Sequence, residues 1–118
     1  MAMWFGGDYN PEQWDAATVE EDIRLMKEMH VNCVTLGVFS WVALEPEDGV
    51  FTFDWLEEIM DKLYANGIDV VLATPTDGMP FWLTKKFPSV MHTTIEGVQA
   101  LGGTREKICP NDVIYRKY

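Results

Sequence analysis

The sequence predicts a parallel α/β fold, and three observations lead to this prediction. Three short apolar segments, each long enough for a strand, are centred near residues 5, 35 and 71. In the two stretches between them, apolar residues recur at helical spacing. The segment centres lie about 30 and 36 residues apart, which matches βαβ units of roughly 30 or more residues. Strands and helices that alternate in this way form a parallel sheet with helices packed outside it.

The first predicted strand is the apolar run Trp4-Phe5-Gly6. Asn10-Pro11 then predicts a helical turn, because the fixed φ of proline suits the first helical position. Asp15 is a good N-cap for the longer helix that follows. The apolar positions of that helix recur at helical spacing and are Val19, Ile23, Met26 and Met29 or His30.

The second strand is predicted over residues 33–38, where a near-continuous apolar run is typical of a strand covered on both faces. A loop follows, and Asp54-Trp55-Leu56-Glu57 then has the pattern of a capping box at the start of a second helix. Gly67 stands where a C′ glycine ends a helix. Residues 68–73 form the third predicted strand. The apolar face of the second helix consists of Leu56, Ile59, Met60 and Leu63.

After Thr74 the alternation stops, and prolines and glycines punctuate a long irregular segment. We expect one helical turn within it, over Phe81–Lys86, and an N-cap at Asn111 before a final helical stretch over residues 113–118. A loop of this length inside a compact domain usually has a function.

The composition of the 118 residues, 13.5 kDa in mass, fits one globular domain and excludes several classes of partner. Nineteen acidic against nine basic residues give a net charge of −10, which disfavours nucleic acid and anionic membrane surfaces. There is no apolar run of about 18 residues that would span a bilayer, and no targeting segment is visible. Two cysteines do not make a disulfide framework, so we expect a cytoplasmic protein.

Candidate site residues are those that follow the predicted strands, because ligands of parallel α/β folds bind at the carboxyl ends of the strands. Each has a structural alternative: the polar residues can organise turns, the tryptophans can pack loops, and Glu45 beside Pro46 can anchor its loop. No metal-ligand cluster and no nucleophile elbow are present. The candidates are Asp8, Tyr9, Asn10, Phe39, Ser40, Trp41, Glu45, Thr74, Asp77, Trp82 and Arg105.

Several motifs in register resemble glycoside hydrolase family 42 β-galactosidases. The resemblance runs over nearly the whole chain and in the order of the family. Its motifs are Phe5-Gly6-Gly7-Asp8-Tyr9-Asn10-Pro11-Glu12-Gln13-Trp14, Glu21-Asp22-Ile23-Arg24-Leu25-Met26-Lys27, Leu36-Gly37-Val38-Phe39-Ser40-Trp41, Leu44-Glu45-Pro46, Leu72-Ala73-Thr74-Pro75-Thr76, and Arg105 with Cys109-Pro110-Asn111.

The resemblance implies that residues 1–118 are the first three βα units of a (β/α)8 TIM barrel, truncated before strand four. It implies a parent enzyme that hydrolyses terminal β-D-galactosides with retention. The family's acid/base glutamate follows an asparagine, and its nucleophile lies on a later strand. None of the four asparagines here precedes a glutamate. We therefore expect no catalytic residue in this chain and no activity from it alone.

The resemblance also implies roles for two residues. Arg105 matches an arginine that binds galactose, and Cys109 matches a ligand of a structural zinc found in some members. No cofactor is required for the implied reaction. Because three parallel strands leave open edges, we expect a homo-oligomer. The alternative is a freestanding half-barrel that binds a carbohydrate or a partner without catalysis.

Overall fold

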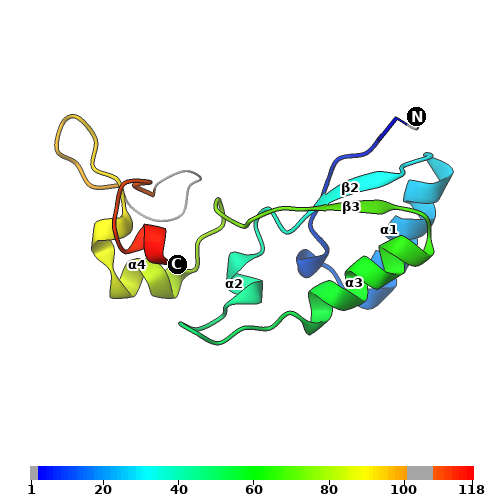
Figure 1. Ribbon diagram of the computed structural model, residues 1–118, viewed down its shortest axis with the longest axis horizontal. Coiled ribbons are helices and arrows are strands. Elements are labelled where there is room, and N and C mark those ends of the chain that lie inside the picture. The colour runs from blue at the N-terminus through cyan, green and yellow to red at the C-terminus, as the bar shows by residue number, and fades with distance from the viewer. Residues whose placement is uncertain (1–2, 101–107) are drawn as a thin grey trace.

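The computed structural model describes residues 3–100 and 108–118. The predicted alternation of strands and helices is confirmed, with one short helix, α2, added in the loop after β2 (Figure 1). In chain order the elements are β1 (Asp8–Tyr9), the 3₁₀ turn η1 (Pro11–Gln13), α1 (Ala16–Glu28), β2 (Cys33–Leu36), α2 (Trp41–Leu44), α3 (Asp54–Ala65), β3 (Asp69–Leu72), α4 (Phe81–Lys86) and the 3₁₀ turns η2 (Pro88–Val90) and η3 (Tyr115–Lys117).

The three strands form one parallel sheet in the order β1-β2-β3. In the register of the sheet, Asp8 lies opposite Thr35 and Leu36 lies opposite Leu72. Helices α1 and α3 lie along the same face of this sheet (Figure 1). The predicted parallel α/β class is therefore correct for the described residues.

The main core lies between the sheet and these two helices. Alternate residues of β2, Val34 and Leu36, point toward the helices, as the two-residue period of a strand requires. Leu63 of α3 and Leu36 are both fully buried. Met29 and His30 follow α1 and are exposed, so that part of the predicted apolar face is wrong. The helical residues buried in this core are otherwise ones that the periodicity predicted: Val19, Ile23, Leu56, Ile59 and Leu63.

The ends of the helices agree with the sequence in two places and differ in one. The carboxylate of Asp15 accepts a hydrogen bond from the amide of Thr18 at 2.8 Å, so Asp15 caps α1 as predicted. Gly67 follows α3 with a φ of +74°, and its amide donates to the carbonyl of Tyr64. The predicted capping box is wrong. Phe53 occupies the N-cap position with near-helical backbone angles, so Asp54 is already inside the first turn and its side chain makes no cap bond.

The first strand was predicted too early in the chain. Residues 4–6 run beside the start of β2, where the amide of Asn32 donates to the carbonyl of Phe5 at 3.0 Å, but the strand itself is Asp8–Tyr9. Trp4 and Phe5 are exposed, so their apolar character does not reflect burial in this chain. The other two strands are each two residues shorter than predicted.

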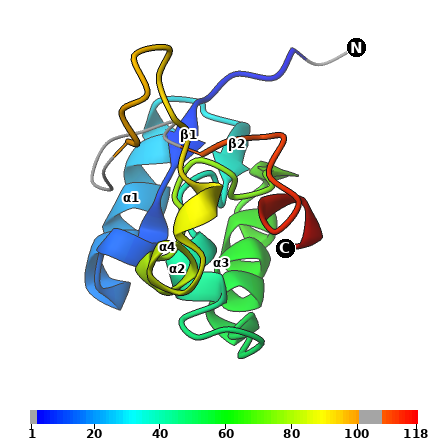
Figure 2. The ribbon, with the colours of Figure 1, turned by 90° about the vertical axis from the view of Figure 1, so that its left-hand side faces the viewer.

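Residues 75–100 and 108–118 gather around a second, smaller core. Figure 2 looks onto this end of the molecule, where α4 lies in front of α2. Helix α4 is confirmed over the predicted residues, and its Leu83 is fully buried. The predicted cap at Asn111 is wrong, because Asp112 instead accepts hydrogen bonds from the amides of Ile114 and Tyr115. The buried members of this second core are Trp41, Leu83, Val90 and Met91.

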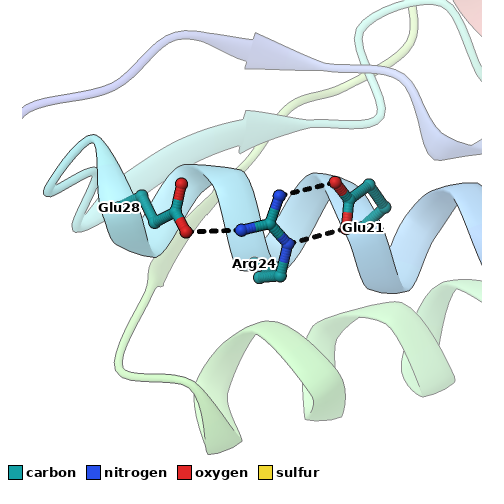
Figure 3. Close-up of polar contacts among 3 residues, drawn as sticks. All are labelled: Glu21, Arg24 and Glu28. Atoms are coloured by element: carbon teal, nitrogen blue, oxygen red, sulfur yellow. Dashed lines mark hydrogen bonds and ion pairs between the residues drawn. The ribbon is translucent and has the colours of Figure 1, made fainter.

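The outer face of α1 is charged and lies away from the strand ends. Arg24 donates in a fork to the carboxylate of Glu21 at 2.6 and 2.7 Å and also pairs with Glu28 one turn later (Figure 3). Exposed pairs of this kind contribute little to stability. Within the described ranges, no helix is both long enough and apolar enough to span a bilayer.

Candidate functional site

The carboxyl ends of β1, β2 and β3 meet at one edge of the sheet because the strands are parallel. Asn10 follows β1 and Ser40 follows β2, and both were candidates from the sequence. Ser40 is fully buried. Its hydroxyl oxygen and the Asn10 side-chain oxygen are buried without a hydrogen-bond partner among the described residues. Such atoms carry a desolvation cost of about 1–3 kcal/mol each, which a hydrogen-bonding group at this edge would offset.

A cavity of about 400 Å³ opens near this edge, beside α2. Its walls are mainly aromatic, and Phe51 and Phe53 are stacked nearly parallel with ring centres 5.7 Å apart. Trp41 forms another wall, with its ring centre 6.2 Å from that of Tyr115. Flat apolar rings of this kind suit the carbon face of a sugar as well as other apolar groups. The lining residues are Trp41, Leu44, Glu45, Phe51, Phe53, Thr74, Pro75, Thr76, Tyr115 and Tyr118.

Glu45 is the acidic residue of this cavity and is 5% exposed. One carboxylate oxygen accepts a hydrogen bond from the indole N–H of Trp41 at 2.9 Å, and the other accepts from the amide of Gly49 at 2.9 Å. Its backbone carbonyl accepts from the indole N–H of Trp82 at 2.8 Å. The interpretation of Glu45 as a loop anchor is therefore consistent with its contacts.

A salt bridge lies close to Glu45 in the sequence, at Asp48. Asp48 pairs with Lys86 of α4 and also accepts a hydrogen bond from the hydroxyl of Tyr118 at 3.2 Å. The hydrogen bond from Lys86 is the main cause that lowers the pKa of Asp48. Loss of solvent contact, followed by the bond to Asp48, raises the pKa of the Tyr118 phenol. Tyr118 also lines the cavity.

Other sequence candidates fall outside this arrangement. Arg105 lies outside the described residues. Asp8 is exposed at the start of β1. Cys109 is half-buried with a free thiol, and its amide donates to the carbonyl of Val90. The only other cysteine, Cys33, is buried in β2.

A structural zinc site needs about four ligands. Across residues 3–100 and 108–118, no group of three or more His, Cys, Asp or Glu side chains could hold a metal ion. The role of Cys109 as a zinc ligand therefore stays an expectation from the resemblance, with the remaining ligands outside these residues.

The aromatic lining was only partly visible in the sequence. Trp41 was identified because it follows a strand, whereas Phe51, Phe53, Tyr115 and Tyr118 were not. A signal that could have identified the phenylalanines is their position in the loop that leads from the end of β2 to the start of α3. This loop begins at the carboxyl end of the strand, so its residues lie near the same edge of the sheet. The tyrosines come from a distant part of the chain, and no local pattern places them there.

The chain is a parallel α/β protein with a polar and aromatic strand-end edge, the edge at which folds of this class bind their ligands. Comparison with known proteins gives the family. The sequence pattern described as β-galactosidase of glycoside hydrolase family 42 matches residues 8–118. The chain therefore belongs to glycoside hydrolase family 42.

Individual relatives agree with this assignment. The chain is 47% identical over 117 residues to β-galactosidase Pbg of Clostridium perfringens and 45% identical over 117 residues to β-galactosidase GalA of Bacillus licheniformis, and each match covers 98% of this chain. The crystal structure of β-galactosidase from Bacillus circulans sp. alkalophilus superposes with a TM-score of 0.93 at 43% identity over 98% of this chain. The structural neighbours of this chain are TIM barrels. The chain spans only 17% of the length of each of the three named relatives and corresponds to an N-terminal segment.

Proposed function

We propose that residues 1–118 are the first three βα units of a (β/α)8 catalytic domain in an enzyme that hydrolyses terminal β-D-galactosides with retention. The observation that carries the proposal is the family match over residues 8–118, together with the close superposition on a solved β-galactosidase. The substrate is a small β-galactoside, and neither nucleic acid nor a membrane is a partner. Two free thiols support a cytoplasmic location.

Within this proposal the chain contributes to binding and not to bond cleavage. Retaining hydrolysis uses two carboxylates about 5–5.5 Å apart, one as acid/base and one as nucleophile. The Asn-Glu pair that the family uses for the acid/base does not occur in this sequence. Arg105 is proposed to donate hydrogen bonds to galactose. The reaction requires no cofactor. Cys109 is proposed to contribute one thiolate to a structural zinc, with the other ligands supplied from outside these residues.

The test compares two polypeptides with the same nitrophenyl β-D-galactoside. The purified 118-residue chain is expected to be inactive, because it lacks both general acid catalysis and a covalent nucleophile. A longer polypeptide that continues this reading frame through an Asn-Glu strand end is expected to be active. Sustained turnover by the 118-residue chain would overturn the first expectation, and an inactive, folded longer polypeptide would overturn the assigned activity.

The second candidate function is a freestanding binding module without catalysis. The aromatic cavity supports it, because flat apolar rings suit the carbon face of a sugar. Calorimetric titration of the 118-residue chain with galactose and lactose tests whether it binds a sugar, and the natural reading frame separates the two candidates. Binding by a chain whose natural reading frame stops at Tyr118 would favour the module. A reading frame that continues would favour the enzyme segment.

A further inference from the structure

One buried acidic residue, Glu45, joins the segments that follow β2 and β3. Its carboxylate holds the indole of Trp41 and the amide of Gly49, which belong to the segment after β2. Its backbone carbonyl holds the indole of Trp82, which belongs to α4 after β3. Two tryptophans from different βα segments are thus fixed by a single residue.

The surroundings of Glu45 distinguish it from a surface acid. No ion pair among the described residues includes Glu45, and its carboxylate is held instead by N–H donors in a largely dry site. A buried acidic group is costly unless its hydrogen bonds are well formed. Glu47, two residues later, is exposed and serves as a matched acid in the same loop.

Glu45 acts on the cavity through Trp41. The indole of Trp41 lines the cavity and also belongs to the second core with Leu83 and Val90. Packing holds the faces of the ring, and the hydrogen bond to Glu45 sets the direction of its N–H edge. Loss of that bond allows the ring to tilt within its packed site, which changes the shape of the wall.

We propose that Glu45 is a positioning residue that orients Trp41, and with it the aromatic wall of the strand-end cavity, for binding of the substrate. The inference rests on the proposed function, since it assigns the cavity to the galactoside or its leaving group. Because Glu45 acts on a binding wall and not on the reacting atoms, its loss raises KM and leaves kcat nearly unchanged.

The kinetic test uses the full-length enzyme with Glu45→Gln, Trp41→Phe, the double variant and the control Glu47→Gln. Glutamine keeps the size of Glu45 but turns one acceptor oxygen into a donor that faces an N–H. We expect E45Q and W41F each to raise KM about three- to tenfold, the range of one hydrogen bond. In the W41F background E45Q should add less than twofold, because the bond it would break is already absent. E47Q should leave KM and kcat unchanged.

A second readout, independent of activity, is the near-ultraviolet circular dichroism of the 118-residue chain. E45Q should change the indole bands, and E47Q should not. Unchanged KM and unchanged indole bands in folded E45Q would overturn the inference, as would a KM effect that is fully retained in the W41F background. If E45Q does not fold, the test rests on W41F. A KM of W41F within twofold of the wild-type value would then overturn the inference. A wild-type enzyme without galactosidase activity would instead overturn the proposed function, while the circular dichroism still tests the orientation of Trp41.

Discussion

At the scale of single residues, Gly6 shows how closely the chain before β1 approaches β2. A Cβ at this position would lie 1.7 Å from the carbonyl oxygen of Cys33, which is a backbone atom and cannot rotate away. At the adjacent Gly7 a Cβ would meet nothing within 4 Å. The same substitution at Gly6 and at Gly7 can therefore be compared directly, because the added Cβ clashes at the first position and not at the second.

We expect Gly6→Ala to destabilise the fold by about 1–3 kcal/mol, the usual cost of overpacking. Gly7→Ala should change stability by about 0.5 kcal/mol or less, the usual range for surface substitutions. Urea denaturation of both variants at the same protein concentration measures the difference. Equal midpoints for the two variants would mean that residues 4–6 do not lie against Cys33.

Arg105 is the residue that the family resemblance assigns to galactose. A buried hydrogen bond to a charged donor is worth about 1.5–3 kcal/mol. Arg105→Ala in the full-length enzyme should therefore lower kcat/KM by roughly ten- to a hundredfold. Arg105→Lys should restore only part of the loss, because an ammonium cannot form the planar fork of a guanidinium.

The control for this prediction is thermal stability. The Tm of Arg105→Ala should stay close to that of the wild type, because the resemblance assigns Arg105 to substrate binding and not to the fold. Wild-type kinetics would mean that Arg105 does not contribute to galactose binding. A parallel loss of activity and Tm would mark it as structural.

The residues at the site were predictable to the extent that they follow strands. Asn10, Ser40 and Trp41 were identified because chain order alone brings the carboxyl ends of parallel strands together. The contacts of Glu45 were not predictable in detail, since Trp82 lies 37 residues away and no local pattern links the two. Tyr115 and Tyr118 reach the cavity for the same non-local reason.

At the scale of elements, α3 shows what hydrophobic periodicity determines. Leu63 is fully buried against the sheet, whereas Tyr64, the next residue, is 81% exposed. Leu63→Ala should destabilise the fold by about 2–5 kcal/mol, the range for a large-to-small change in a core. Tyr64→Ala should stay within about 0.5 kcal/mol of wild type. Thermal denaturation of the two variants checks this, and a similar loss for both would mean that α3 packs through a different face.

Helices were easier to predict than strand boundaries for a physical reason. A helix of 12 or 13 residues repeats its apolar pattern over several turns, so α1 and α3 were both identified. The strands are two to four residues long, and apolar character alone did not separate Trp4-Phe5-Gly6 from the true strand Asp8–Tyr9. The N-cap of α3 was predicted one residue too late, because Phe53 already adopts near-helical backbone angles.

At the scale of the whole molecule, the chain is longer than a compact domain of its size. Its radius of gyration is 16.9 Å, and its extents are 50 × 29 × 23 Å. A compact chain of this length would have a radius of gyration of roughly 13–14 Å. The sheet with α1 and α3 forms one end and α4 with the C-terminal turn forms the other (Figure 1). Among residues 3–100 and 108–118, the outer strands β1 and β3 each pair with a neighbour on one side only.

Because the edge of β3 is open, we predict that the 118-residue chain self-associates. Val71 and Leu72 are 45% and 54% exposed, although both belong to a strand whose neighbour β2 is buried. An unpaired, apolar strand edge readily pairs with another strand. Light scattering at high protein concentration should give a mass of at least twice 13.5 kDa. The net charge of −10 opposes association, so added salt should strengthen it.

A matched pair of valines tests whether the β3 edge is responsible. Val71→Lys places a charge on the open strand, whereas Val42→Lys places the same charge on α2, where Val42 is 53% exposed. We expect Val71→Lys to shift the chain toward the monomer and Val42→Lys to leave its association unchanged, because a lysine on an edge strand disfavours pairing with another strand. A stable, well-folded wild-type monomer at high concentration would contradict the prediction. Equal association of the two lysine variants would place the contact on a surface other than β3.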